Sequence, residues 1–157
     1  MMGSGKSTVG SRVAALLSLP FVDTDERIEE VEGRSVRQIF EQEGETYFRE
    51  KEHELLLSLP NEPCVVACGG GLPCFFDHIE QLKTKGVVVY LRASPLVLYE
   101  RIKAGSSRPK LQDFQSFVLL LEQRELLYQK AHLSIDADQS EEHIVSQLLS
   151  VLASAHQ

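Results

Sequence analysis

The sequence predicts an open α/β domain with a central parallel sheet and helices on both of its faces. Two apolar runs, residues 63–68 and 86–93, are short and rich in valine, which is typical of strands buried on both faces. Segments with helical apolar spacing lie before and after these runs along the chain, as expected for helices that cover a parallel sheet. Polar motifs follow the strands directly, and in such folds ligands bind at the carboxyl ends of the strands.

The individual elements follow from apolar spacing and from the residues that start and stop helices. Ser35 and Gln38 form the pattern of a capping box, and Ser94 followed by Pro95 is a typical helix start. The charged segment 27–59 predicts helices that are broken at its two glycines. The expected helices are 7–19, 27–59, 95–103, 113–131 and 141–152, and the expected strands are 21–25, 63–68, 86–93 and 132–136.

The composition is that of a globular domain and excludes several function classes. The 157 residues fit a single domain, 1–157, with 43% apolar and 25% charged residues. A net charge of −7 argues against general binding to nucleic acids or to anionic membranes. The chain has no apolar run long enough to cross a bilayer and no signal-peptide pattern at its start, so we expect a cytoplasmic protein. Its three cysteines, Cys64, Cys68 and Cys74, are expected to be reduced thiols.

The opening motif "GSGKST" is the second half of a phosphate-binding loop, G-x-x-x-x-G-K-[ST]. In such a loop the glycines let backbone amides surround phosphate oxygens at the start of a helix. Lys6 would then reach the β- and γ-phosphates, and the Ser7 hydroxyl would bind Mg²⁺. The alternative is a glycine turn that happens to precede a helix. The motif therefore predicts ATP and Mg²⁺ as cofactors.

The motif "DTD" ends the first predicted strand with two carboxylates. Alternate residues of an extended segment point the same way, so Asp23 and Asp25 could both face the phosphate loop. One acid beside Mg²⁺ and one beside a substrate hydroxyl suit phosphoryl transfer to an alcohol. The alternative is a solvated turn in which Asp25 caps the next helix.

Glycines and arginines further along the chain supply the remaining candidates. The run Gly69–Gly71 favours close approach of a ligand to the backbone, although a loose turn would have the same composition. Arg49 lies one helical turn from Glu52, as in a surface ion pair, and Arg124 lies within a predicted helix; an anionic co-substrate would give both a bidentate partner. Arg108 lies in a loop that could close over ATP or simply be exposed. The five histidines show no ligand spacing.

Taken in order, these motifs resemble those of shikimate kinases over essentially the whole chain. The matching stretches are "MGSGKSTVG", "FVDTDERIE", "GRSVRQIFEQEGETYFREKE", "VVACGGG", "RP" in a short loop, and "RELLYQKA". The resemblance implies a three-layer P-loop kinase fold and transfer of the γ-phosphoryl group of ATP to the 3-hydroxyl of shikimate. It further implies a monomer with a substrate-binding helical subdomain at 27–60 and a lid at 101–112.

The resemblance also implies roles for individual residues. Lys6, Asp25 and Arg108 would be catalytic, and Ser7 and Asp23 would hold the metal. Shikimate would be bound by Asp25, Arg49, Gly69, Gly70, Gly71 and Arg124. ATP would be bound by Gly3, Ser4, Gly5, Lys6, Ser7, Thr8, Val9, Gly10, Arg101 and Arg108.

Two alternatives and one irregularity remain at this point. The chain could be another small-molecule P-loop kinase, such as a gluconate or nucleoside monophosphate kinase, or a nucleotide-binding module without catalysis. The irregularity is that a phosphate loop ordinarily follows a strand, which in this fold would lie mid-sheet, whereas this loop opens the sequence. We therefore expect strands 63–68 and 86–93 to lack a shared neighbour, and a natural start further upstream, which intact-mass measurement would test.

Overall fold

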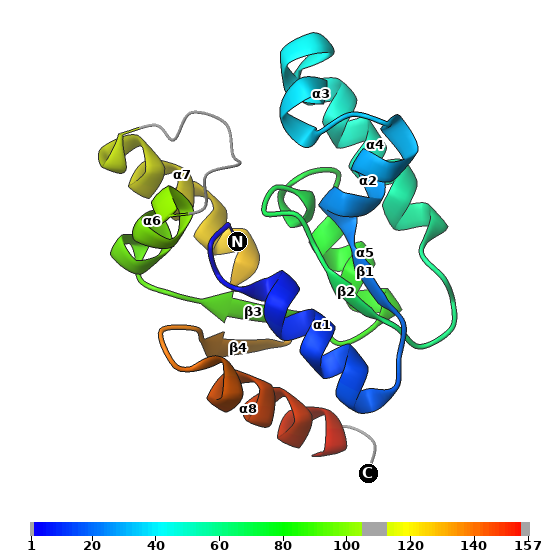
Figure 1. Cartoon of the computed structure of the whole chain (residues 1–157), viewed down its shortest axis with the longest axis vertical. Coiled ribbons are helices and arrows are strands. Elements are labelled where there is room, and N and C mark those ends of the chain that lie inside the picture. Colours follow the sequence, from blue (N-terminus) through cyan, green and yellow to red (C-terminus); the bar gives the residue numbers. More distant parts are fainter. Residues whose placement is uncertain (1, 105–112, 155–157) are drawn as a thin grey trace.

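Helices and short strands follow one another along the chain in the order that the sequence predicts, except between residues 68 and 89, where the structure has an additional helix (Figure 1). The computed structural model describes residues 2–104 and 113–154. The helices are α1 (Lys6–Leu17), α2 (Thr24–Glu32), α3 (Val36–Gln42), α4 (Gly44–Ser58), α5 (His78–Lys85), α6 (Pro95–Ala104), α7 (Phe114–Tyr128) and α8 (Glu141–Ser154), with a 3₁₀ turn, η1, at Leu72–Cys74. The strands are β1 (Phe21–Asp23), β2 (Val65–Ala67), β3 (Val89–Arg92) and β4 (Leu133–Asp136).

Local capping explains where several helices begin and end. Ser35 accepts a hydrogen bond from the Gln38 amide and the Gln38 side chain accepts one from the Ser35 amide, which confirms the capping box. Gly33, in the left-handed region at φ 63°, ends α2 as expected. Helix α5 and the turn η1 were not expected from the sequence, because residues 72–85 lack a long apolar repeat.

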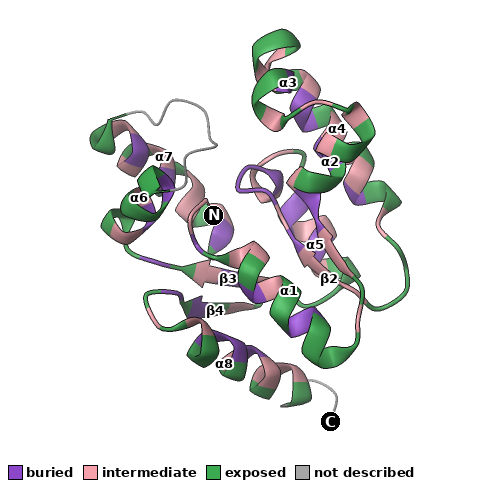
Figure 2. Ribbon diagram, in the orientation of Figure 1, coloured by how far each residue is buried: buried purple, intermediate pink, exposed green. Residues whose placement is uncertain are grey.

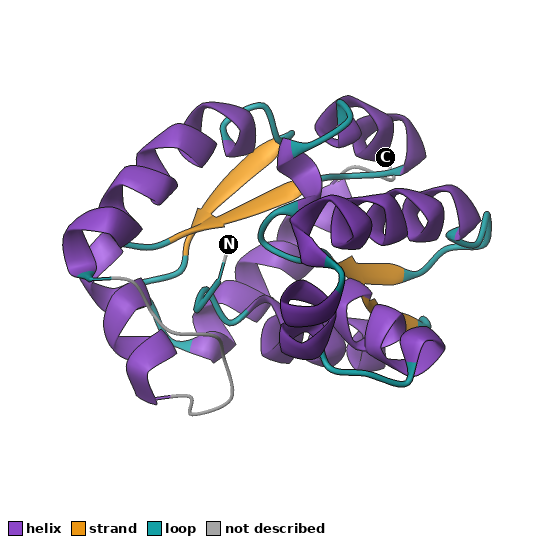
Figure 3. Ribbon diagram, turned by 90° about the horizontal axis from the view of Figure 1, so that it is seen from above, coloured by secondary structure: helices purple, strands orange, loops and turns teal. Residues whose placement is uncertain are grey.

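The described strands form two separate parallel pairs, β1 with β2 and β3 with β4. Figure 3 shows the two pairs lying apart, each flanked by helices. Phe21 pairs with Val65 in the first pair, and Val89 pairs with Leu133 in the second. The central sheet is therefore interrupted between β2 and β3, which is where the sequence predicts that two strands lack a shared neighbour.

One apolar core nevertheless contacts both strand pairs. Buried side chains of α1, α6, α7, β4 and α8 meet in it, and Val65 of β2 and Val89 of β3 pack against the same cluster. Helix α1 lies against β1, β2 and α8, so it bridges the two pairs along one side. Figure 2 shows the buried residues concentrated toward the middle of the molecule.

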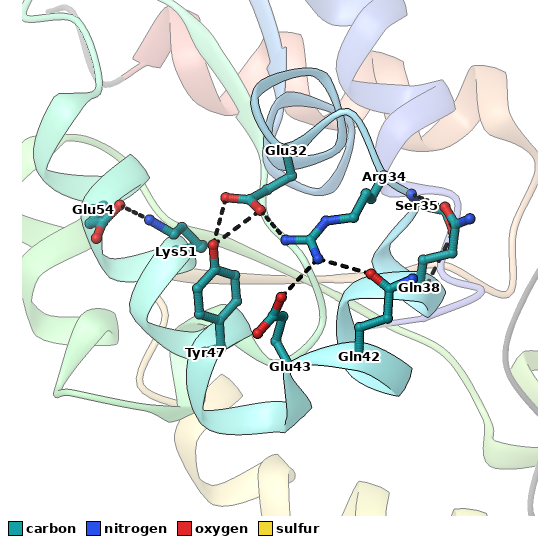
Figure 4. Close-up of polar contacts among 9 residues, drawn as sticks. All are labelled: Glu32, Arg34, Ser35, Gln38, Gln42, Glu43, Tyr47, Lys51 and Glu54. Atoms are coloured by element: carbon teal, nitrogen blue, oxygen red, sulfur yellow. Dashed lines mark hydrogen bonds and ion pairs between the residues drawn. The ribbon is translucent and has the colours of Figure 1, made fainter.

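Helices α2, α3 and α4 form a unit with a core of its own. Ile28, Ile39 and Phe48 are buried together there. On its surface Arg34 pairs with Glu32 at 2.6 Å and with Glu43 at 2.9 Å (Figure 4). Tyr47 donates a hydrogen bond to Glu32 from the neighbouring helix (Figure 4). These contacts fix the start of α4, the helix that carries Arg49.

Among the residues that the structure describes, no helix has both the length and the apolar character that crossing a bilayer requires.

Candidate active site

The phosphate loop leads directly into α1, and its glycines have conformations that other residues rarely adopt. Gly5 is the N-cap of α1 with φ 79°, and Gly3 has φ 74°. A Cβ atom at Gly3 would also lie 2.9 Å from the backbone oxygen of Leu98, so the loop is packed against α6. The first turn of α1 contains no acidic residue. The amides and the helix dipole there form a positive end suited to a phosphate group.

Asp23 connects the first strand to this loop. Its Oδ2 atom accepts a hydrogen bond from the Ser7 hydroxyl at 2.5 Å, and its side chain is buried. Its Oδ1 atom accepts from the Asp25 amide at 3.0 Å and so caps α2. The alternative in which Asp25 provides this cap is therefore wrong, because Asp23, one residue before the helix, occupies the N-cap position. Two oxygens, one from Ser7 and one from Asp23, meet beside the phosphate loop.

The glycine run after β2 contacts both the strand end and α4. The Gly69 amide donates a hydrogen bond to the Thr24 hydroxyl at 2.7 Å, in a buried position. A Cβ atom at Gly69 would collide with Oδ1 of Asp25 and lie 3.1 Å from Oε1 of Glu52. Both carboxylates thus face the same glycine, and only a residue without a side chain fits there. This space requirement explains the glycine better than a loose turn does.

Arg49 and Glu52 form a buried ion pair, not a surface one. Arg49 Nη1 lies 2.6 Å from Glu52 Oε2, and the two side chains are 8% and 1% exposed. Arg49 Nη2 also lies 2.8 Å from Oε1 of Glu45, whose side chain is 55% exposed. Burial by itself would lower the pKa of Arg49, but the charges of Glu52 and Glu45 outweigh it and raise the pKa. The guanidinium stays charged inside the protein.

Aromatic and glycine neighbours fix the position of that guanidinium. The Phe75 ring lies 4.3 Å from Arg49 Cζ, a cation–π distance. A Cβ atom at Gly71 would overlap the guanidinium, so the glycine run and Arg49 are in direct contact. Phe75 therefore packs on the side chain of a predicted site residue.

Glu52 is the most perturbed carboxyl group of the site. Burial raises its pKa to about 7, Arg49 and Arg124 oppose that change, and Asp25 adds to it. Its Oε2 atom accepts from Arg49, whereas its Oε1 atom is the buried side-chain polar atom that lacks a hydrogen-bond partner within the described part of the chain. An unsatisfied buried oxygen of this kind is costly unless a ligand completes it.

Helix α7 closes the site from the other side. The Tyr128 hydroxyl donates to the Gly70 carbonyl at 2.5 Å, and this contact is buried. Burial raises the pKa of Cys74, and the Arg124 charge opposes that rise, which places Arg124 near η1 as well as near Glu52. The charge of Arg124 therefore acts on groups of both α4 and η1.

Cys68 marks the point where the segments converge. Burial raises the pKa of this thiol to about 12, and the charges of Lys6, Glu52 and Asp25 all act on it. Asp25 and Glu52 therefore lie beside the glycine run, and the charge of Lys6 acts on the residue that precedes it. The ends of β1 and β2 thus lie together, as their parallel pairing and the contacts of Gly69 with Thr24 and Asp25 show.

A small cavity of about 170 Å³ continues from the phosphate loop toward α8. Arg101 donates from both terminal nitrogens to the Ala137 carbonyl at 3.1 Å and thereby fixes the loop after β4. The cavity is lined by Ser4, Gly5, Thr8, Val9, Arg101, Ala137, Gln139, Glu141 and Ile144. A larger cavity, of about 510 Å³, lies between α7 and the ends of β3 and β4 and contains none of the predicted site residues.

The structure describes all the predicted site residues except Arg108, and it places them in two neighbourhoods, one at the glycine run and one at the phosphate loop with the small cavity beside it. Arg108 falls outside the described residues, as does most of the predicted lid. Sequence reasoning did not select Glu52, Thr24 or Tyr128, which hold Arg49, Gly69 and Gly70 in place. The sequence did indicate a contact between Glu52 and Arg49, because they stand three residues apart on a predicted helix. That spacing does not show whether the pair is buried or exposed.

Comparison with known proteins gives a consistent family. The shikimate kinase family model matches residues 2–153. A shikimate kinase from Bacillus anthracis (strain CDC 684 / NRRL 3495) is 39% identical over 150 residues, which are 94% of this chain and 91% of the relative. The solved structure of shikimate kinase from Acinetobacter baumannii in complex with shikimate superposes with a TM-score of 0.91 at 34% identity, covering 98% of this chain and 89% of that one.

The gluconate kinase alternative is less well supported. The solved structure of a gluconokinase from Sinorhizobium meliloti 1021 superposes with a TM-score of 0.59 at 21% identity, and the match covers 98% of this chain and 87% of that one. This likeness shows a common fold alone. The comparisons confirm the predicted α/β P-loop kinase fold and the predicted kinase class. On this basis the chain belongs to the shikimate kinase family.

Proposed function

We propose that the protein transfers the γ-phosphoryl group of ATP to the 3-hydroxyl of shikimate, giving ADP and shikimate 3-phosphate for chorismate and aromatic amino acid biosynthesis. The observation that carries the proposal is the convergence of Asp25 and the buried Arg49–Glu52 pair on the glycine run beside the phosphate loop. A substrate that is both an acid and an alcohol matches this pairing of arginine and carboxylates.

ATP would bind along α1 with its phosphates on the loop. Residues Gly3 to Gly10 would present amides and hydroxyls to the phosphates, and Lys6 would contact the β- and γ-phosphates. The cavity beside Arg101 and Gln139 continues from this loop, which supports placing the base there. Arg108, in the proposed lid at 101–112, would add positive charge over the transferring group.

Ser7 and Asp23 would hold Mg²⁺. Their oxygens lie 2.5 Å apart beside the loop, and hard cations of this type prefer hydroxyl, carboxylate and phosphate oxygens. Mg²⁺ in proteins is commonly held by one or two protein oxygens together with phosphate oxygens and water. When bound, Mg²⁺ neutralises phosphate charge and orients the phosphates.

Shikimate would lie between the glycine run, α4 and α7. Arg49 and Arg124 would bind its carboxylate, and the Gly70 amide would face it near the γ-phosphate. Asp25 would accept the hydrogen bond of the hydroxyl that is phosphorylated, either orienting it or taking its proton. The unpartnered Oε1 atom of Glu52 supports a further hydroxyl contact in this space. Residues 27–60 would form the substrate-binding subdomain of a cytoplasmic monomer that uses small-molecule substrates and binds neither nucleic acid nor membrane.

The decisive experiment is an ADP-release assay with ATP and Mg²⁺, with and without shikimate. We expect ADP release that depends on shikimate and that gluconate and AMP do not support. Phosphorylation of gluconate or AMP with shikimate inert would favour another small-molecule kinase. ATP binding with no acceptor-dependent turnover would indicate a nucleotide-binding module.

Asp25→Asn tests the role of the acid next to the hydroxyl. We expect turnover to fall by about 10²–10⁴-fold while ATP still binds, because the amide cannot take a proton. Asp136→Asn, at the exposed aspartate that ends β4, is the matched control and should keep its turnover. Near-normal turnover of Asp25→Asn would remove this residue from the mechanism.

Arg124→Ala tests the carboxylate contact. We expect the KM for shikimate to rise by about tenfold to a hundredfold and the KM for ATP to change little, because a charged hydrogen bond to one substrate is lost. Arg92→Ala, at an exposed arginine of β3, is the control. Equal increases of both KM values would contradict the assignment.

A further inference from the structure

Two histidines outside the proposed chemistry form a hydrogen-bonded link between α4 and the glycine run. His53 Nδ1 of α4 lies 2.9 Å from His78 Nε2 at the start of α5. His78 Nδ1 in turn lies 2.9 Å from the Leu72 carbonyl oxygen. The His78 side chain is fully buried, whereas His53 is half-buried.

Hydrogen-bond chemistry assigns the protons along this link. A carbonyl oxygen can only accept, so His78 Nδ1 must carry the hydrogen and donate it to Leu72. In the neutral imidazole the other nitrogen, Nε2, is then an acceptor, and His53 Nδ1 must donate to it. Burial lowers the pKa of His78, in agreement with a neutral ring.

The link joins the two halves of the shikimate site. Leu72 directly follows Gly69–Gly71 and is itself fully buried. His53 directly follows Glu52 and lies one helical turn beyond Arg49 on α4. The histidine pair therefore connects the loop that carries the glycines to the helix that carries the arginine.

The backbone beside His78 is held in an uncommon conformation. Phe76 and Asp77 have φ values of 49° and 56°, in the left-handed region that residues with a side chain adopt at an energetic cost. The Phe76 ring lies against both histidines, with centroid distances of 5.2 Å to His53 and 5.4 Å to His78. Such a conformation persists only where surrounding contacts fix it, and the histidine link is one of them.

We propose that His78 is a positioning residue for shikimate: it sets the distance between the Gly69–Gly71 loop and Arg49 through its bonds to Leu72 and His53. This inference rests on the proposed function. A carboxylate held by Arg49 and a ring held against the glycine amides require those two elements at a fixed separation. In the proposed complex ATP does not contact both of these elements, so loss of the link should weaken the binding of shikimate and leave that of ATP unchanged.

Steady-state kinetics of the whole chain with both substrates test the proposal. His78→Phe keeps a ring in the buried space and removes both hydrogen bonds, and we expect it to raise the KM for shikimate about tenfold. The KM for ATP and kcat should change less than about twofold, because binding of one substrate is weakened without a change in the chemical step. His132→Phe removes a histidine whose Nδ1 accepts from the Val88 amide away from the site, and it should leave both KM values unchanged.

Two further variants separate positioning from a structural role. His78→Asn keeps a donor near the Nδ1 position for Leu72 but loses the acceptor for His53, so it should restore part of the shikimate affinity that His78→Phe loses. His53→Phe cuts only the bond to α4 and should raise the KM for shikimate about threefold, which keeps a readout if His78→Phe does not fold.

The possible results are distinguishable. A wild-type protein without shikimate-dependent turnover would overturn the proposed function and this inference with it. An active wild type whose His78→Phe and His53→Phe variants keep their KM for shikimate would overturn only the positioning role. Equal changes in the KM for ATP, or no recovery in His78→Asn, would also overturn it.

Discussion

Glu52→Gln should change the way in which stability depends on pH. Glu52 is 1% exposed, and burial raises its pKa from an ordinary 4.5 to about 7. The folded protein therefore keeps this proton at pH values where the unfolded chain has released it. The stabilising contribution of the neutral form is complete below pH 4.5 and is lost as pH rises toward 7. The interval between the two pKa values corresponds to about 3 kcal/mol.

Urea unfolding of the wild type and the variant between pH 4 and pH 8 measures this contribution. Glutamine does not titrate in this range, so the free energy of unfolding of the variant should not decrease between pH 4.5 and pH 7 for this reason. The difference between variant and wild type should rise by about 3 kcal/mol from about pH 4.5 to above pH 7. Any constant effect of glutamine on the contact with Arg49 is the same at each pH and cancels from this rise.

A control on the same helix isolates burial as the cause. Glu50 is exposed on α4, so Glu50→Gln should leave the wild-type pH dependence in place. A difference between Glu52→Gln and wild type that stays flat from pH 4.5 to pH 8 would refute the reasoning. A difference that falls with pH would mean that Arg49 more than compensates for the burial of the carboxyl group.

The other predictions concern the glycine run. Gly71→Ala should reduce stability and raise the KM for shikimate, because the added methyl group would overlap the guanidinium of Arg49; Gly86→Ala, where a Cβ atom meets nothing within 4 Å, is the control in thermal unfolding and kinetics. Tyr128→Phe leaves the buried Gly70 carbonyl without its donor and should cost about 1–3 kcal/mol in denaturant unfolding; a loss below about 0.3 kcal/mol would show that the carbonyl finds another donor.

Local patterns in the sequence were sufficient for the order of most elements. Apolar spacing and caps are properties of a few neighbouring residues, so the capping box at Ser35 and the helix start at Pro95 could be predicted directly. Helix α5 escaped this reasoning because its eight residues contain only Ile79 and Leu82 as apolar side chains. Its position depends on packing against η1 and α4, which no local pattern encodes.

In the candidate site, too, some residues could be predicted from local patterns and others could not. The motif residues were predictable because phosphate loops and strand-end acids have fixed local chemistry. The burial of Arg49 and Glu52 was not, because Phe75 and Gly71, which cover the guanidinium, come from a loop more than twenty residues away. The i, i+3 spacing on α4 is the same for an exposed pair and a buried one.

Arg49 has two carboxylate partners of unequal strength, and this difference indicates how a substrate can enter. Glu52 is buried and bonds Nη1, whereas Glu45 is largely exposed and bonds both Nε and Nη2 through its Oε1 atom. An exposed partner contributes about 0–1 kcal/mol, so releasing Glu45 into water costs little. Releasing Glu52 would leave a charge buried without its partner, at a cost of about 3–5 kcal/mol. In the proposed complex the substrate carboxylate therefore replaces Glu45 on the Nε and Nη2 edge, while Glu52 keeps the guanidinium oriented toward the glycine run.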